Sequence, residues 1–281
     1  MLKDEKTIMK RGINLKVENV CCLIERIAPA KFAAEWDNVG LLCGRRNANV
    51  SKVLLCVDVT TEVIDEAINN GCELIVSHHP FLMTKINSIE DSDFKSRQIL
   101  TLAENKIAVI AAHTNADAVD GGMNDYLAKL LGVVDVKTTD FSIYLRVGKL
   151  GESNHSAGTQ ANRGAISVKS LVELVKKRLS LETAIVCGDL NKMVSRIGFY
   201  TGGVDAKELI AAKELFDVVI TGEFSYHKAL DLKEEGITAV LCGHFGSELL
   251  FTWWFKEILN RENPNLKVFI SETQKEPFIF I

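Results

Sequence analysis

The sequence predicts an α/β protein made of two related halves with mainly parallel sheets. Three observations lead to this prediction. Short apolar runs alternate with amphipathic segments, the alternation occurs twice along the 281 residues, and polar residues recur where the apolar runs end. Repeated β–α alternation is typical of parallel strands joined by right-handed crossovers. Because ligands bind beyond the carboxyl ends of strands in such sheets, a functional site is expected there.

The first predicted half, residues 1–150, begins with helical periodicity over 18–33 that ends near Pro29. Thr60 or Thr61 is the expected N-cap of the next helix, and Gly71 is its expected stop. The later elements of this half follow the same apolar patterns. The predicted strands cover 53–57, 72–77 and 107–112, and the predicted helices after the first cover 62–69, 92–104 and 123–131.

A segment rich in Gly, Ser, Asn, Thr and Gln, residues 151–165, is expected to be a polar linker. The second predicted half, residues 166–281, then resumes the alternation. Its predicted helices cover 168–179, 206–215 and 247–260, and its predicted strands cover 184–187, 195–200, 218–221, 238–241 and 267–271.

The composition is that of an ordinary globular protein and excludes several classes. A net charge of −4 argues against broad electrostatic binding to nucleic acid or to an anionic membrane. No apolar run approaches the roughly 18 residues of a membrane span. Seven cysteines without a CxxC pair indicate free thiols in a reducing compartment. With no apolar signal core at the N-terminus, a cytoplasmic location is expected, and a nuclear or organellar location stays open.

The two halves repeat one another in the placement of polar residues. His78 and His79 end the strand 72–77, and the sequence around Glu223 matches this position in the second half. His113 and His244 follow the next strand of each half, and each is followed four residues later by an acid, Asp117 or Glu248. Two α/β halves that face a shared cleft would bring these strand ends together.

Imidazole and carboxylate groups without thiolates suit zinc, manganese or iron(II). The metal candidates are His78, His79, Asp117, His244 and Glu248. Successive side chains of a strand diverge, so His78 and His79 are expected to serve different ions of a close pair, roughly 3.5–4 Å apart. The sequence therefore predicts that the halves share a dinuclear metal cleft. Ordinary roles remain open for the acids: Glu248 near a helix N-terminus, and Asp117 in a turn.

Three further residues are candidates for catalysis. Glu223 and His227 flank the repeat position of the histidine pair and suit proton transfer or support of the metal ligands, although they are equally compatible with a polar loop edge. His113 suits either support of the ligands or the role of a general base.

Six segments together resemble the GTP cyclohydrolase I type 2 homolog family, also called Nif-three-like. They occur in the expected order between residues 20 and 275: Glu35-Trp-Asp-Asn-Val-Gly-Leu41, Ser77-His-His-Pro-Phe81, His113-Thr-Asn-Ala-Asp117, Gly121-Gly-Met-Asn-Asp125, Thr221-Gly-Glu223 and Gly243-His-Phe-Gly-Ser-Glu248. The resemblance implies two α/β domains around two metal ions held by the five ligands named above. It also implies a homohexameric toroid whose metal sites face an internal cavity. This chain resembles a short form of the family, because only about fifteen polar residues follow Arg146-Val-Gly-Lys-Leu150, where long members insert a domain.

Two hypotheses of function follow. The first is a metal-dependent hydrolase that acts on a nucleotide-like or cyclic amide or phosphoester substrate through a metal-bridging water. The second is a non-catalytic, ring-shaped interaction or regulatory protein whose ions are structural, which would bring protein partners rather than a small-molecule substrate. The Trp-bearing helix near the C-terminus and the absence of a recognisable substrate motif favour the second.

Overall fold

A computed structural model describes residues 15–151 and 164–279. The chain divides into two compact units, the first drawn from Met1–Ala116 and Phe251–Pro277 and the second from Asp117–Leu250 and Phe278–Ile281. Most of the predicted linker, residues 152–163, lies outside the described residues.

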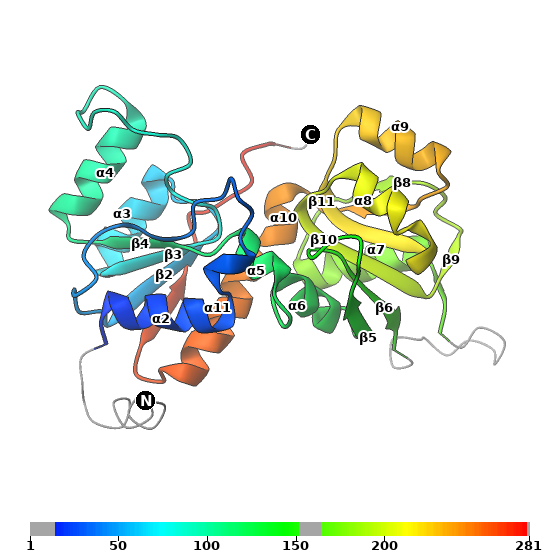
Figure 1. The fold of residues 1–281 in the computed structure, drawn as a ribbon, viewed down its shortest axis with the longest axis horizontal. Helices are drawn as coiled ribbons and strands as arrows, with labels where there is room; N and C mark the ends of the chain where they lie inside the picture. The colour runs from blue at the N-terminus through cyan, green and yellow to red at the C-terminus, as the bar shows by residue number, and fades with distance from the viewer. Residues whose placement is uncertain (1–14, 152–163, 280–281) are drawn as a thin grey trace. The chain divides into compact units, whose positions relative to one another are not determined.

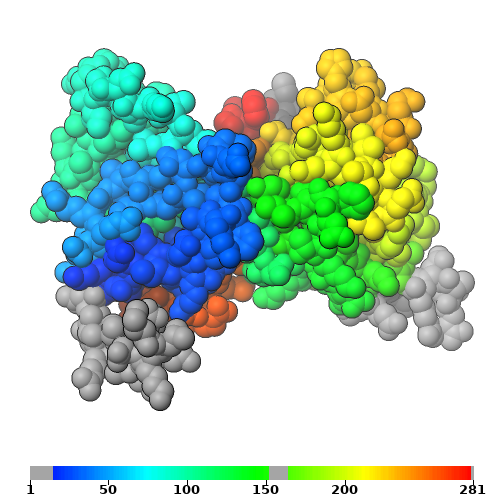
Figure 2. All heavy atoms as spheres, in the orientation of Figure 1, coloured from blue at the N-terminus to red at the C-terminus, as the bar shows by residue number. Residues whose placement is uncertain are grey.

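The first unit is built on a five-stranded sheet (Figure 1). Four neighbouring strands are parallel, and β1 pairs antiparallel with β4 at one edge. The order is β1 (Gly40–Cys43), β4 (Ala108–Ala111), β3 (Leu74–Ser77), β2 (Lys52–Cys56) and β13 (Lys267–Ile270). The helices of this unit are α2 (Val17–Ile27), α3 (Thr61–Asn70), α4 (Phe94–Glu104) and most of α11 (Leu250–Glu262). Figure 2 shows the segment before α4, in cyan, on the surface of this unit.

The second unit contains a six-stranded mixed sheet. Its strands β10, β11 and β12 are parallel, and the outer strands pair antiparallel. The order is β5 (Val133–Thr138), β6 (Arg146–Leu150), β10 (Arg196–Gly203), β11 (Val218–Glu223), β12 (Ala239–Leu241) and β8 (Ile185–Cys187). The helices are α6 (Met123–Leu130), α7 (Val168–Leu179), α8 (Ala206–Ala211), α9 (Tyr226–Glu234) and α10 (His244–Glu248). The short strands β7 (Ile166–Ser167) and β9 (Met193–Val194) pair separately.

The predicted α/β class is confirmed, and so is the repeated topology. Each unit contains a β-α-β-α-β run of three neighbouring parallel strands, β2-α3-β3-α4-β4 in one and β10-α8-β11-α9-β12 in the other. A short helix then follows the third strand of each run, α5 (Thr114–Ala118) or α10. No helix of the described residues is long and apolar enough to cross a membrane.

The chain is divided differently from the predicted halves 1–150 and 166–281. β5 and β6 precede the linker but belong to the sheet of the second unit, where β6 pairs with β10 and β5 pairs with β6. β13 returns near the end of the chain to pair with β2 in the first unit. Among individual elements, the predicted helix 247–260 is α10 followed by α11, and the predicted helix 206–215 is α8 followed by a 3₁₀ turn.

Local signals explain the ends of α3. The Thr60 hydroxyl accepts a hydrogen bond from the Val63 amide at 3.3 Å, which satisfies one of the free donors of the first turn. Gly71 ends the helix with φ of 64°, a left-handed conformation that glycine adopts without steric cost. This helix therefore has the predicted cap and stop.

Candidate metal centre

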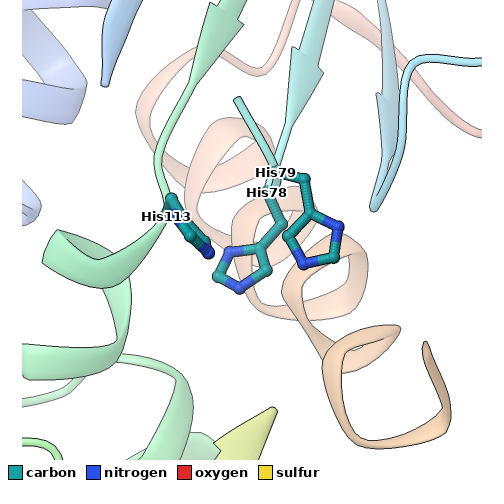
Figure 3. A group of neighbouring side chains, drawn as sticks. All are labelled: His78, His79 and His113. Carbon is teal, nitrogen blue, oxygen red and sulfur yellow. The ribbon is translucent and has the colours of Figure 1, made fainter. Parts of the chain in front are cut away.

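Three histidines gather at the carboxyl edge of the first unit's sheet. His78 and His79 follow β3 directly, and His113 follows the neighbouring parallel strand β4, whose Ala111 pairs with Ser77. The ring centroids lie 5.1–5.3 Å apart, and each histidine offers one ligand nitrogen within 4.8 Å of the others. Figure 3 shows the three rings converging from the two strand ends. This arrangement could hold a metal ion.

Backbone hydrogen bonds to β2 hold the main chain of His78 and His79 in place. The amides of His78 and His79 donate to the carbonyl oxygens of Cys56 and Val57 at 3.1 and 2.9 Å, so the β2–β3 ladder continues past the formal end of β3. His78 is fully buried, whereas the side chain of His79 is 24% exposed. One imidazole is thus enclosed by protein while its neighbour remains accessible.

Each of these rings is oriented through its Nδ1 atom. His78 Nδ1 lies 3.0 Å from the Ala112 carbonyl oxygen, which can only accept, so this nitrogen carries the proton. His79 Nδ1 donates to Asp58 Oδ1 at 2.8 Å, and His113 Nδ1 donates to Asp37 Oδ1 at 3.0 Å. Nε2 is therefore the ring nitrogen through which each of the three histidines could bind a metal ion. Metal-binding histidines are oriented by such partners.

Asp37 is the most constrained of these acceptors. Its carboxylate also accepts from the amide of Thr114 at 3.1 Å and from the Thr114 hydroxyl. Burial alone would raise the pKa of Asp37, but the hydrogen bonds from His113 and Thr114 outweigh burial and lower the pKa to about 2. The carboxylate is therefore ionised at neutral pH and keeps the proton of His113 on Nδ1. The neighbouring Trp36 lies against the His113 ring at 5.8 Å and is 64% exposed.

The second unit carries an equivalent group at the carboxyl edge of its own sheet. His244 and Glu248 begin and end α10, and His244 Nε2 lies 3.1 Å from Glu248 Oε2. His244 Nδ1 donates to Glu223 Oε1 at 2.9 Å, the same use of Nδ1 as in the first unit. Asp117 accepts a hydrogen bond from the Thr201 hydroxyl at 3.1 Å, and both acids that were predicted as ligands are buried.

A glycine on β10 leaves room for the Glu248 carboxylate. Gly202 has φ of +67°, and a Cβ atom at this position would lie 2.2 Å from Glu248 Oε1 and 3.7 Å from His244 Nε2. The amide of Gly202 donates to the Ser247 hydroxyl at 3.0 Å, which ties β10 to α10. The approach of carboxylate to backbone therefore depends on the absence of a side chain here.

The three residues predicted as candidates for catalysis have different surroundings in the structure. Glu223 is bonded to His244, as support of a ligand requires, and His113 joins the histidine cluster itself. His227 lies in the first turn of α9, is exposed, and contacts the ring of Tyr226 at 5.6 Å. The described contacts therefore associate Glu223, and not His227, with His244.

Asp37 and Asp58 were not singled out from the sequence. Asp58 follows β2 by two residues, so its place at the carboxyl edge of the sheet was a usable signal. Asp37 gave no such signal, because it lies 76 residues from the histidine that it orients.

Comparison with known proteins agrees with the fold and with the motifs. The family model Duf34/NIF3 (NGG1p interacting factor 3) matches residues 15–277. A protein of Clostridium perfringens named GTP cyclohydrolase 1 type 2 homolog is 34% identical over 278 residues, which cover 95% of this chain and 100% of that protein. NIF3-like protein 1 of Drosophila melanogaster is 31% identical over 92% of this chain and 87% of that protein. In fold, the chain is similar to a hypothetical protein from Staphylococcus aureus, with a TM-score of 0.84, 24% identity, and coverage of 96% of this chain and 100% of that one. The chain therefore belongs to the Duf34/NIF3 family.

Proposed function

We propose that this protein binds two divalent metal ions, zinc, manganese or iron, and is a metal-dependent hydrolase of a nucleotide-like or cyclic amide or phosphoester substrate. The ligands are His78, His79, Asp117, His244 and Glu248, and the histidine cluster adds His113 as a neighbour of the ions. When bound, a pair of ions would lower the pKa of a water between them and polarise an oxygen of the substrate.

The common orientation of the histidines carries this proposal. Four imidazoles from two different units all use Nδ1 to donate to an oxygen, which leaves Nε2 as the ring nitrogen that can bind a metal ion in each of them. Histidines that only fill a core have no reason to share one tautomer, whereas metal ligands need an unprotonated nitrogen of fixed direction.

Chain connectivity supports a site built from both units. Asp117 is four residues from His113 and lies in α5, which begins directly after His113. Glu248 precedes Phe251 by three residues, and the ring of Phe251 lies 5.2 Å from that of His78. Three residues of chain span at most about 11 Å. In sequence, Asp117 and Glu248 thus each lie within four residues of a residue that belongs to or contacts the histidine cluster.

The proposed roles of the remaining polar residues follow from their partners. Glu223 orients His244, and Asp37 and Asp58 orient His113 and His79. A ring nitrogen of His113, or the exposed His227 if it approaches the substrate, would move protons during hydrolysis.

Metal analysis tests the proposal before any substrate is known. The purified protein, loaded with zinc, manganese or iron(II), is expected to hold two ions per chain. His78→Ala and His244→Ala are each expected to reduce this content, whereas His227→Ala should keep both ions. The loaded protein is then screened against nucleotides, cyclic amides and phosphoesters. Two ions without any turnover, or turnover that survives both ligand substitutions, would refute the hydrolase.

The alternative is a ring-shaped interaction or regulatory protein in which the ions are structural. The family description, which refers to an interacting factor, favours it. The Trp-bearing helix favours it less than expected, because Trp254 is buried and packs against Phe251 and Phe255 of α11. We further propose a homohexamer, as the family resemblance implies. Chelation that dissociates the oligomer, measured by light scattering, while all catalytic assays stay silent would support the alternative.

A further inference from the structure

A half-buried lysine packs against the aromatic ring that follows His79 by two residues, and it has no carboxylate within ion-pair distance in the described part of the chain. Lys95 lies in the first turn of α4, and its ammonium sits 4.1 Å from the centroid of the Phe81 ring and 5.5 Å from that of Phe94. Within the described part of the chain, this ammonium takes part in no ion pair and donates no hydrogen bond. Lys95 is only half-buried, but its charge has no carboxylate within ion-pair distance in the described part of the chain.

The position of Lys95 belongs to the same sheet edge as the histidines. Phe81 follows His79 by two residues and is itself buried. In the crossover from β3 through α4 to β4, the helix begins at the carboxyl edge of the sheet, where β3 ends (Figure 1). Asp58, the carboxylate that orients His79, is the anion that interacts electrostatically with Lys95. All four residues belong to the first unit.

The surroundings of Lys95 leave its charge only partly compensated. Burial lowers the pKa of Lys95, and the Asp58 carboxylate opposes this change without approaching within ion-pair distance. The Phe81 ring offers the cation its negatively polarised face, which holds the ammonium in place but does not neutralise it. An oxyanion that entered here would gain a charge-assisted hydrogen bond from a preorganised donor.

We propose that Lys95 forms an anion subsite beside the histidine cluster and binds a phosphate or carboxylate group of the substrate. The role of this subsite rests on the proposed function, because it places the anionic end of the substrate next to the ions. Lys95 is in this view a specificity-determining residue: it favours anionic substrates over neutral ones of the same shape.

Titration calorimetry with inorganic phosphate, and separately with acetate, tests the subsite. Each titration is made on the metal-loaded and on the metal-free protein. Lys95→Met removes the charge and keeps most of the apolar stem, Lys95→Gln provides a second neutral variant, and Lys95→Arg keeps the charge. Lys129→Met is the matched control, since Lys129 also lies over an aromatic ring, that of Tyr126 at 5.4 Å, but in the second unit.

The neutral variants are expected to bind phosphate about tenfold more weakly, the scale of one charge-assisted hydrogen bond. Lys95→Arg and Lys129→Met should stay within about threefold of the wild type. Metal content and Tm should be unchanged in all four. Any of three results would overturn the subsite. The wild type and the neutral variants could bind phosphate with equal affinity, Lys129→Met could lose as much phosphate affinity as the neutral variants, or the wild type could bind no phosphate. If the wild type binds no metal ions, the proposed function is refuted instead. The titrations of the metal-free protein would still show whether Lys95 binds phosphate. Acetate binding that follows the same pattern extends the subsite to carboxylates.

Discussion

Gly202→Ala tests whether the approach of Glu248 to β10 matters for metal binding. The new Cβ would lie 2.2 Å from Glu248 Oε1, whereas an unstrained carbon–oxygen contact is about 3.3 Å. The carboxylate would have to move by about 1 Å, which exceeds the tolerance of about 0.5 Å for a working site. The left-handed φ of +67° adds a backbone cost of about 1 kcal/mol for any residue with a Cβ.

Two other glycines of the second unit separate these effects. At Gly236, φ is +71° and a Cβ would meet no atom within 4 Å, so Gly236→Ala carries the backbone cost alone. At Gly203, a Cβ would also meet no atom within 4 Å, and φ lies outside the left-handed range, so Gly203→Ala carries neither cost. The three variants thus form a graded series on one unit.

Metal affinity, measured by competition with a chromophoric chelator, is expected to fall about 10- to 100-fold in Gly202→Ala and to stay at the wild-type value in the two controls. Urea denaturation should show a loss of about 1 kcal/mol for Gly236→Ala, a larger loss for Gly202→Ala, and almost none for Gly203→Ala. Wild-type metal affinity in Gly202→Ala would refute the inferred role of Glu248. An equal loss of affinity in Gly236→Ala would attribute the effect to the backbone instead.

Three further predictions concern hydrogen bonds of single side chains. Asp58→Ala should weaken metal binding about 10- to 100-fold by releasing His79, and a chelator competition that gives wild-type affinity would contradict this role. Thr60→Ala should lower the free energy of unfolding by about 1 kcal/mol through loss of the α3 N-cap, whereas Thr60→Ser, measured in the same urea titration, should not. Burial would raise the pKa of Asp217, but amide and Arg196 hydrogen bonds lower it to about 2. Because this folded-state pKa lies below the ordinary 3.8, the stabilisation is complete above pH 4 and disappears as the pH falls toward 2. Acid unfolding curves of Asp217→Asn should lack this dependence.

Much of the fold could be predicted because its signals are local. Short stretches of consecutive residues carry these signals. They include the N-cap and C-cap of α3, the buried apolar runs of β2, β3 and β4, and the histidines that follow β3 and β4. The membership of β13 in the first sheet and of β5 and β6 in the second could not be predicted. These pairings join segments far apart in the chain, and the apolar pattern of a strand does not specify its neighbour.

The same distinction applies to the site. The ligand types at strand ends pointed to a metal, but the atoms that orient them come from elsewhere in the sequence. Asp37 reaches His113 across 76 residues, and the Ala112 carbonyl that fixes His78 has no side-chain signature at all. The position of Lys95 over the Phe81 ring could likewise not be predicted, because an isolated lysine in an amphipathic helix normally faces water.

The return of β13 to the first sheet has a consequence for synthesis on the ribosome. Domains usually fold in the order in which they are translated. Here the residues of the second unit up to Leu250 leave the ribosome before Lys267–Ile270, which pair with β2 and close the first sheet. Until then β2, with the buried Val53, Leu54 and Leu55, has an exposed edge of the kind that promotes aggregation. The sheet that is begun first is therefore closed only after most of the second unit has been synthesised, and nascent chains that stall before residue 267 should be the ones that require chaperones.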